Sequence, residues 1–276
     1  MDWYEHDDGV RTRQTRSQTS VRGVLTGDID TAEERLSLAR SRVVAASSGP
    51  CAFVNPVARG IVRAPPEAFD RLRGHSGAAT ISPQQARAPE KCGAIGPVFP
   101  GVEQQVQIDS QRFRVIRPTD AVCAGKNLAT TVQIAEALRA VPAFQRAETN
   151  EIFVSPIPHP NTTATSTTAG EGGAGEIVLY PMSSVQTQND FDNRITHESG
   201  HNFQGKFWLD SQGGAQWQVQ ASLDNRRPSP YCLKDSGEDF SEFNVLFNTT
   251  RGTRCELTCR QIYPHRWAKM IEYLLR

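Results

Sequence analysis

Two histidines stand four residues apart in the segment His197-Glu-Ser-Gly-His201. Residues at positions i and i+4 lie one above the other on a helix, so both imidazoles can reach one zinc ion about 2 Å away. Glu198 follows the first histidine directly and can reach a water bound to that ion. The spacing indicates a zinc site with a general base beside it. The alternative is two unrelated histidines that flank a solvated glutamate.

A second group of polar residues lies in the segment 231–247. Asp235 or Ser236 can cap a helix there, with Glu238 three residues after Asp235 as the acidic member of a capping box. Glu238 and Glu242 would lie one turn apart, where two carboxylates repel unless a cation or imidazoles face them. The alternative is a solvated acidic stripe. The expected apolar face of this helix consists of Phe240, Phe243, Leu246 and Phe247.

Together these segments resemble the gluzincin metallopeptidases, in particular the anthrax lethal factor-like catalytic domains and the zincin toxin domains of bacterial effectors. In that family a histidine pair is followed by Tyr, six residues, Glu, three residues and Glu. Tyr231, Glu238 and Glu242 reproduce both intervals. The stretch PSPYCLKDSGEDFSEF also resembles the family's S-x-Y...E-D-F-A-E run, with Ser241 in place of Ala. The resemblance covers residues 103–276.

The resemblance implies a role for each matched residue. Glu198 would be the general base, and Tyr231 would stabilise the oxyanion of the transition state. Glu242 would be an outer partner that contacts the ligands and not the metal. The zinc ligands would be His197, His201 and Glu238.

The fold class expected from these observations is α+β and zincin-like. It would combine a small twisted sheet, the metal-binding helix beneath it and a helical C-terminal half that ends in a helix over residues 264–275. The periodicity predicts the metal-binding helix over residues 189–204, with Phe191 and Ile195 against the core and Gly205 as a left-handed cap.

Shorter elements precede this helix. Alternating apolar residues on both sides of Asp109-Ser110 predict a β-hairpin. Residues 127–141 are expected to form a helix that Pro142 ends. Residues 151–154 and 176–180 are expected to form strands, the second being the candidate edge on which a peptide could add as an extra strand. The face predicted for the helix consists of Val132, Ile134, Leu138 and Val141.

The first third of the chain has a different amino-acid composition. Residues 1–100 are rich in Arg, Ser, Ala, Pro and Gly and contain one convincing helical stretch at residues 31–46. We interpret residues 1–100 as an accessory or linker region, either a partly disordered leader or a folded subdomain. Residues 101–276 would then form the metallopeptidase domain.

The charge balance limits the partners of this chain. Thirty Lys and Arg residues match thirty Asp and Glu residues, so no net field favours nucleic acid or anionic membranes. No apolar stretch approaches the about 20 residues that cross a bilayer, and residues 1–16 lack the apolar core of a cleavable secretory signal. With the resemblance, this suggests a soluble effector secreted by another route, possessing a cognate immunity protein or a secretion-system carrier as partner.

Six cysteines leave both buried free thiols and one or more disulfide bonds open, with fifteen possible pairings. Cys255, Cys259 and His265 form only a loose metal-binding pattern, because structural zinc sites usually need four ligands at tighter spacing. His159 is expected to be a surface loop residue, with a place at the border of the active site as the alternative.

The function expected from the sequence is a zinc-dependent endopeptidase, acting on a protein or peptide substrate. Two alternatives remain open. One is a binding module that keeps the zincin scaffold without turnover, although an intact Glu198 and Tyr231 argue against it. The other is a zinc amidase that acts on cell-wall material.

Overall fold

The computed structural model describes residues 49–91, 98–119, 127–160, 169–182, 184–208 and 212–276. Contacts divide the chain into two compact units, Met1–Ala52 and Phe53–Arg276, and the architecture below is that of the second unit. The helix expected at residues 31–46 lies outside the described residues.

The second unit is α+β and contains a mixed seven-stranded sheet. The strands are β1 (Thr80–Ile81), β2 (Gln85–Lys91), β3 (Val98–Ile108), β4 (Gln111–Pro118), β5 (Glu151–Val154), β6 (Gly170–Gly173) and β7 (Glu176–Leu179). The α-helices are α2 (Pro66–Arg73), α4 (Thr131–Arg139), α5 (Ala143–Arg146), α6 (Gln188–Gly205), α7 (Gln212–Asp224), α8 (Ser236–Thr250), α9 (Glu256–Ile262) and α10 (Pro264–Leu274). Two short 3-10 helices are η1 (Ala52–Val54) and η2 (Pro230–Leu233).

The strand order is β1-β3-β4-β5-β7-β6, with β2 also paired to β3. β3 and β4 form the predicted hairpin, whose turn residue Asp109 adopts a left-handed φ of 54°. β5 pairs in parallel with β4 and β7, whereas β6 pairs antiparallel with β7. β7 is therefore an interior strand and the expectation that it forms an edge is wrong. Among the described strands, β6 ends the sheet on this side.

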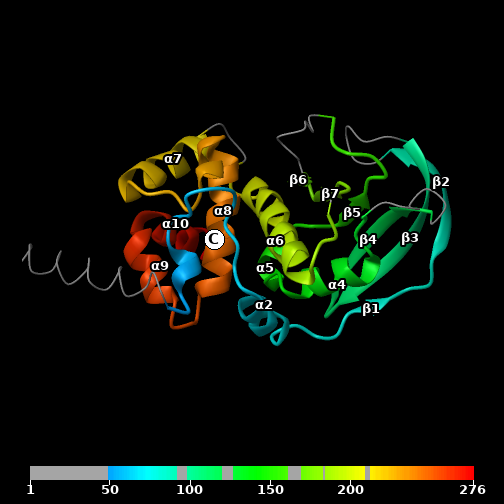
Figure 1. The fold of residues 1–276 in the computed structure, drawn as a ribbon, viewed down its shortest axis with the longest axis horizontal. Coiled ribbons are helices and arrows are strands. Elements are labelled where there is room, and N and C mark those ends of the chain that lie inside the picture. Colours follow the sequence, from blue (N-terminus) through cyan, green and yellow to red (C-terminus); the bar gives the residue numbers. More distant parts are fainter. Residues whose placement is uncertain (1–48, 92–97, 120–126, 161–168, 183, 209–211) are drawn as a thin grey trace, which may run out of the picture. The chain divides into compact units, whose positions relative to one another are not determined.

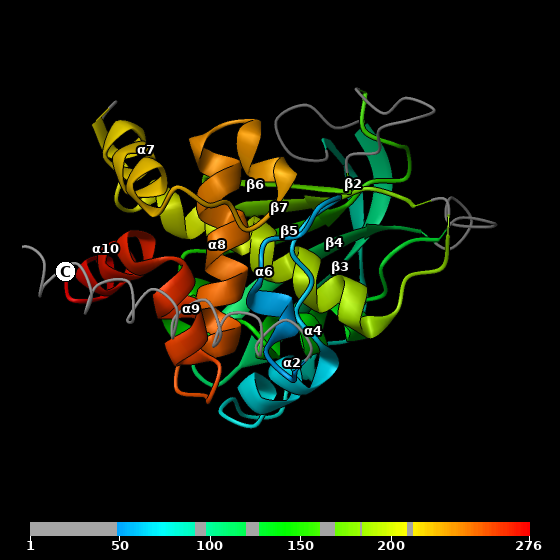
Figure 2. The same cartoon turned by 60° about the vertical axis from the view of Figure 1, so that its left-hand side comes forward.

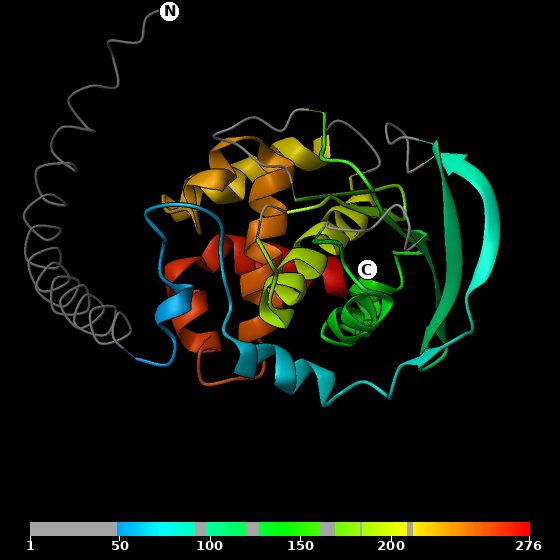
Figure 3. The ribbon, with the colours of Figure 1, turned by 45° about the vertical axis from the view of Figure 1, so that its right-hand side comes forward.

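The compact unit begins well before the boundary expected at residue 100. β2 pairs with β3 along its length, and β1 pairs with β3 through Thr80 and Ile81. Figure 3 shows β2 and β3 as a long pair at the far side of the sheet from the helices. β1 and β2 lack the alternation of apolar and polar residues that is typical of strands, and their sequence therefore resembles that of a linker.

The main core lies between one face of the sheet and two helices, α4 and α6. It joins strand residues such as Val115, Ile152 and Ile177 to Ile134 of α4 and Ile195 of α6. The sequence assigned Val132 to the same helical face, but its side chain is 62% exposed. The buried face of α4 is completed by Thr131, Ala135, Ala137 and Leu138.

α6 starts and ends differently from the prediction. Thr187 caps its N-terminus and forms a capping box with Asp190, so the helix begins at Gln188. At the other end the cap is Lys206 in a right-handed conformation, and Gly205 is the last helical residue. The left-handed cap predicted at Gly205 is therefore wrong.

The helices after α6 form the C-terminal half of the unit, on the opposite side of α6 from the strands (Figure 1). α8 contacts α6, α7, α9 and α10 and runs through the middle of this half (Figure 2). Its predicted apolar face is confirmed, since Phe240, Phe243, Leu246 and Phe247 are all fully buried. Fully buried Arg266 of α10 pairs with both Asp224 of α7 and Asp239 of α8, so these three helices are held together by charge as well as by apolar contacts.

The cysteines follow both patterns that the sequence left open. Cys232 and Cys259 are free and buried, whereas Cys51 and Cys255 are disulfide-bonded. The two cysteines outside the described residues are Cys92 and Cys123.

No helix in the described part of the chain is long and apolar enough to cross a membrane.

Candidate metal centre

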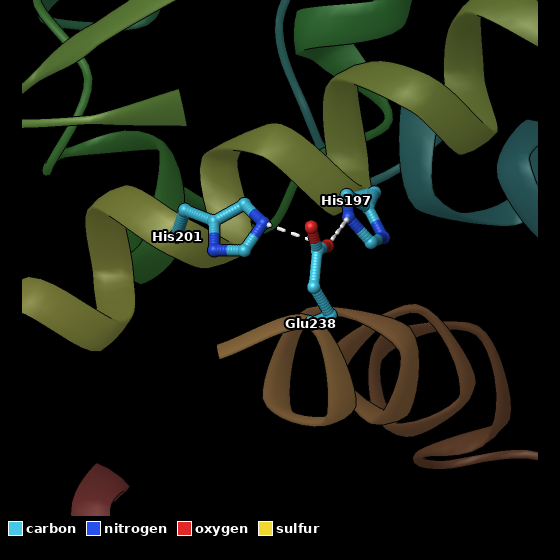
Figure 4. A group of neighbouring side chains, drawn as sticks. All are labelled: His197, His201 and Glu238. Carbon is cyan, nitrogen blue, oxygen red and sulfur yellow. Dashed lines mark hydrogen bonds and ion pairs between the residues drawn. The ribbon is translucent and has the colours of Figure 1, made fainter. Parts of the chain in front are cut away.

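Three side chains from two helices converge at one point between α6 and α8 (Figure 4). His197 Nε2 lies 3.1 Å from Glu238 Oε2, and His201 Nε2 lies 3.3 Å from the same oxygen. One donor atom from each of the three residues lies within 4.8 Å of the other two. The structure thus brings together the three residues predicted as metal ligands. Glu238 lies 37 positions after His201 in the sequence.

These separations fit a tetrahedral zinc site. Ligand atoms about 2.0–2.1 Å from a tetrahedral ion lie about 3.3–3.4 Å from one another. The two nitrogen-to-oxygen distances are close to that edge length. Two imidazoles and one carboxylate are also a donor set that zinc accepts, and they leave a fourth position open. The three residues could therefore hold a metal ion, and their donor set is one that zinc accepts.

Glu242 lies beside the first histidine, on the side away from Glu238 Oε2. Its Oε1 lies 3.1 Å from His197 Nδ1, while its Oε2 accepts hydrogen bonds from the Val62 backbone amide and the Ser229 hydroxyl. Burial alone would lower the pKa of His197, but the Glu238 and Glu242 carboxylates raise it to about 10. The other ring nitrogen, Nε2, lies 3.1 Å from Glu238 Oε2 and is therefore the atom on the side of the metal position.

This contact predicts a measurable effect of Glu242 on metal affinity. Glu242→Gln should weaken zinc binding about 10–100-fold, the usual cost of losing an outer partner of a metal-binding histidine. Competition with a chromophoric chelator measures the change. An affinity equal to that of the parent chain would show that Glu242 does not orient His197.

Glu238 receives hydrogen bonds from several directions. Besides the two histidines, Lys234 Nζ donates to its Oε1 at 2.5 Å and the Tyr231 hydroxyl donates to the same atom at 3.1 Å. Burial opposes its ionisation, but the bonds from His197, His201 and Lys234 hold the pKa of Glu238 far below its usual range. Glu238 is therefore an anion at neutral pH, as a metal ligand must be.

Tyr231 stands beside the same carboxylate. Burial and the charge of Glu238 raise the pKa of Tyr231 to about 12. The phenol thus keeps its proton at neutral pH and remains a hydrogen-bond donor next to the metal position.

Glu198 lies in the wall of a cleft of about 600 Å³ that also contains both histidines, Tyr231 and Glu238. It is 7% exposed. Burial raises the pKa of Glu198. The charges of His197 and His201 act in the other direction but do not outweigh burial. A carboxylate with a raised pKa, on the cleft surface and beside the ligands, is suited to accept and return a proton.

β6 also lines this cleft and lies directly against Glu198. A Cβ atom at Gly172 would collide with the backbone carbonyl of Glu198, and one at Gly170 would come 2.7 Å from its Oε1. Gly170 and Gly172 alternate along the strand and so share one face. The sequence analysis missed this contact, although alternate glycines in a short strand are a signal of close backbone approach.

A matched pair of glycine variants tests this contact. Gly172→Ala should lower the free energy of unfolding by about 1–3 kcal/mol, because the added methyl group forces β6 and α6 apart. Gly173→Ala is the control, since nothing lies within 4 Å of a Cβ there, and it should change stability by less than about 0.5 kcal/mol. Equal effects in chemical denaturation would contradict the close approach.

His159 also lines the cleft, so the expectation of a surface histidine is wrong and the alternative is confirmed. It is buried, and its Nε2 lies 2.7 Å from Glu171 Oε1. Tyr180 donates to the other oxygen of Glu171 at 2.6 Å. Because Glu171 belongs to β6, these contacts help to fix the strand in place.

The weaker metal-binding pattern of the sequence does not form a site. In the part of the chain that the structure describes, no group of three metal-binding side chains includes Cys255, Cys259 or His265.

Comparisons with protein-family models, curated proteins and solved structures found no match to this chain.

Proposed function

We propose that the chain is a zinc-dependent peptidase with a zincin-like fold, in which His197, His201 and Glu238 hold the ion. The observation that carries the proposal is the convergence of these three side chains beside Glu198 and Tyr231 in one cleft. A zinc ion held there would act as a Lewis acid, lowering the pKa of a water in its open position toward about 7.

Glu198 and Tyr231 would have separate roles in hydrolysis. The Glu198 carboxylate would accept the proton of the attacking water and deliver it to the nitrogen of the leaving amine. Its burial and raised pKa support this role, because a base whose pKa is closer to neutral returns its proton more readily.

Tyr231 would donate a hydrogen bond to the oxyanion that develops on the scissile carbonyl. Its hydroxyl is a protonated donor at neutral pH and lies 3.1 Å from Oε1 of the proposed ligand Glu238. A donor placed there helps the transition state more than the ground state. Lys234, which is close to both Tyr231 and Glu238, adds positive charge at the same place.

β6 is the proposed support for the peptide main chain. It ends the described sheet and lines the same cleft as the α6 ligands. Its glycines bring the strand backbone against Glu198, so a peptide paired along β6 would pass beside the base. This replaces β7 as the expected binding edge.

Tyr231→Phe tests the proposal in a peptide-cleavage assay. We expect kcat to fall about 10²–10³-fold while zinc content and KM change little, because the lost hydrogen bond belongs to the transition state. A rise in KM without a fall in kcat would instead place Tyr231 in substrate binding.

A substrate screen separates the proposed peptidase from the two alternatives. Casein-like proteins, defined peptides and cell-wall fragments are incubated with the zinc-loaded chain, and products are identified by mass spectrometry. Cleavage of proteins or peptides supports the proposal. Cleavage of wall fragments alone would establish the amidase, and no cleavage by a zinc-loaded chain would favour the binding module.

A further inference from the structure

A second cavity of about 250 Å³ adjoins the cleft, and both are lined by Gly170, His197, Glu198 and Tyr231. It is smaller than the pockets of about 300–1,000 Å³ that enclose whole small-molecule ligands. It therefore has room for a single side chain, or for one chain end, of a substrate whose main chain lies across the metal centre.

Arg194 is a buried cation in the wall of this cavity. It is 8% exposed and lies one helical turn before Glu198 on α6. Its Nη2 donates to Gln186 Oε1 at 2.8 Å, and Gln186 is neutral. Across the described residues, no carboxylate forms an ion pair with Arg194. A buried guanidinium without an anionic partner is energetically costly. We therefore expect an anionic group of a bound ligand to pair with Arg194 in this cavity.

The acidic groups nearest to Arg194 are engaged elsewhere. Asp190 accepts hydrogen bonds from the Thr187 amide and hydroxyl and from exposed Arg63. Glu198 lines both cavities but forms no ion pair with Arg194 among the described residues. Burial outweighs the field of these two carboxylates, so the pKa of Arg194 lies below its ordinary value. Its charge is only partly compensated within the chain.

We propose that Arg194 is the specificity-determining residue of this site and receives a carboxylate of the substrate. The carboxylate belongs to an Asp or Glu side chain beside the scissile bond, or to the C-terminus of the peptide. A guanidinium binds a carboxylate through two parallel hydrogen bonds, and Gln186 occupies only one of its nitrogens. The inference rests on the proposed function, because it takes the metal centre as the place of cleavage.

Peptide hydroxamates test the carboxylate preference by binding alone. Hydroxamates that differ only in a Glu, Gln or Leu side chain are titrated into the full zinc-loaded chain by calorimetry. We expect the Glu compound to bind about 10–100-fold more tightly than the Gln compound, as a charge-assisted hydrogen-bonded pair allows. A fourth compound, with a free C-terminal carboxylate and no acidic side chain, distinguishes the two sources of the carboxylate.

Variants of Arg194 connect the preference to this side chain. Arg194→Gln should abolish the ratio of Glu to Gln affinity, and Arg194→Lys should restore part of it. Arg63→Gln is the matched control, because Arg63 lines the same cavity but is 61% exposed and already paired with Asp190; the ratio should change less than about threefold. If Arg194 acted only through the protonation of Glu198, Arg194→Gln would change all affinities or rates equally and leave the ratio intact.

Failure of this inference can be told apart from failure of the proposed function. A chain that cleaves peptides without acidic preference, binds the Glu and Gln hydroxamates equally and gains no affinity from a free C-terminal carboxylate would overturn the role of Arg194 alone. A chain that prefers the Glu hydroxamate in an Arg194-dependent way, but cleaves no peptide, would support the carboxylate site and overturn the peptidase.

Discussion

Glu198→Gln is expected to lower kcat/KM for peptide cleavage by about 10²–10⁴-fold while the chain keeps its zinc and its fold. The expected loss follows from the proposed mechanism, in which Glu198 would accept the proton of the attacking water. Zinc remains bound because Glu198 is not among the three converging ligands. The amide is nearly the same size as the carboxylate, so the contact with Gly170 and Gly172 on β6 is preserved.

The matched control for this variant is Glu171→Gln. Glu171 lines the same cleft but contacts His159 and Tyr180 instead of the metal position. Initial rates, zinc content and thermal unfolding are measured for both variants. Turnover retained in Glu198→Gln, with zinc bound and unfolding unchanged, would remove Glu198 from the mechanism.

Glu238→Ala is expected to reduce zinc affinity by at least about 10³-fold, well beyond the roughly 10–100-fold cost of losing an outer partner. It removes one of the three proposed ligands and the only carboxylate among them, leaving two imidazoles on one helix. His201→Ala should have an effect of the same order. Competition with a chelator of known affinity measures all of these variants on one scale.

Protein stability has to be followed in the same variants. Glu238 is buried and hydrogen-bonded to His197, Lys234 and Tyr231, so its loss also removes contacts within the fold. Circular dichroism separates an unfolded chain from a folded chain that no longer binds zinc. A folded Glu238→Ala variant with parent-like zinc affinity would exclude Glu238 as a ligand.

Local patterns of the sequence were sufficient to predict the ligand helices. The i, i+4 spacing of His197 and His201 needs a helix to be useful, and α6 supplies it. Asp235, one of the two candidate caps, caps α8 by accepting from the Glu238 amide, which places Glu238 in the first turn. The Glu238 side chain contacts His197 and His201 instead of completing the predicted capping box. The helix and cap predictions succeeded because caps and helical periodicity depend on neighbours in the chain.

Features that depend on distant contacts were not predictable in the same way. The sheet order makes β6 the terminal described strand and β7 an interior one, and no local pattern fixes that order. The position of the Gly172 backbone against Glu198 joins residues 26 positions apart. The participation of β1 and β2 in the sheet, like the burial of Arg194 without an acidic partner, also becomes visible only in three dimensions.

The most direct measurement is the zinc content of the purified full chain, determined by mass spectrometry after reconstitution and removal of excess metal. We expect one zinc per chain in the parent and a sharp loss in both His197→Ala and Glu238→Ala. A parent chain that binds no zinc, or variants that retain it, would contradict the metal centre on which the proposed function depends.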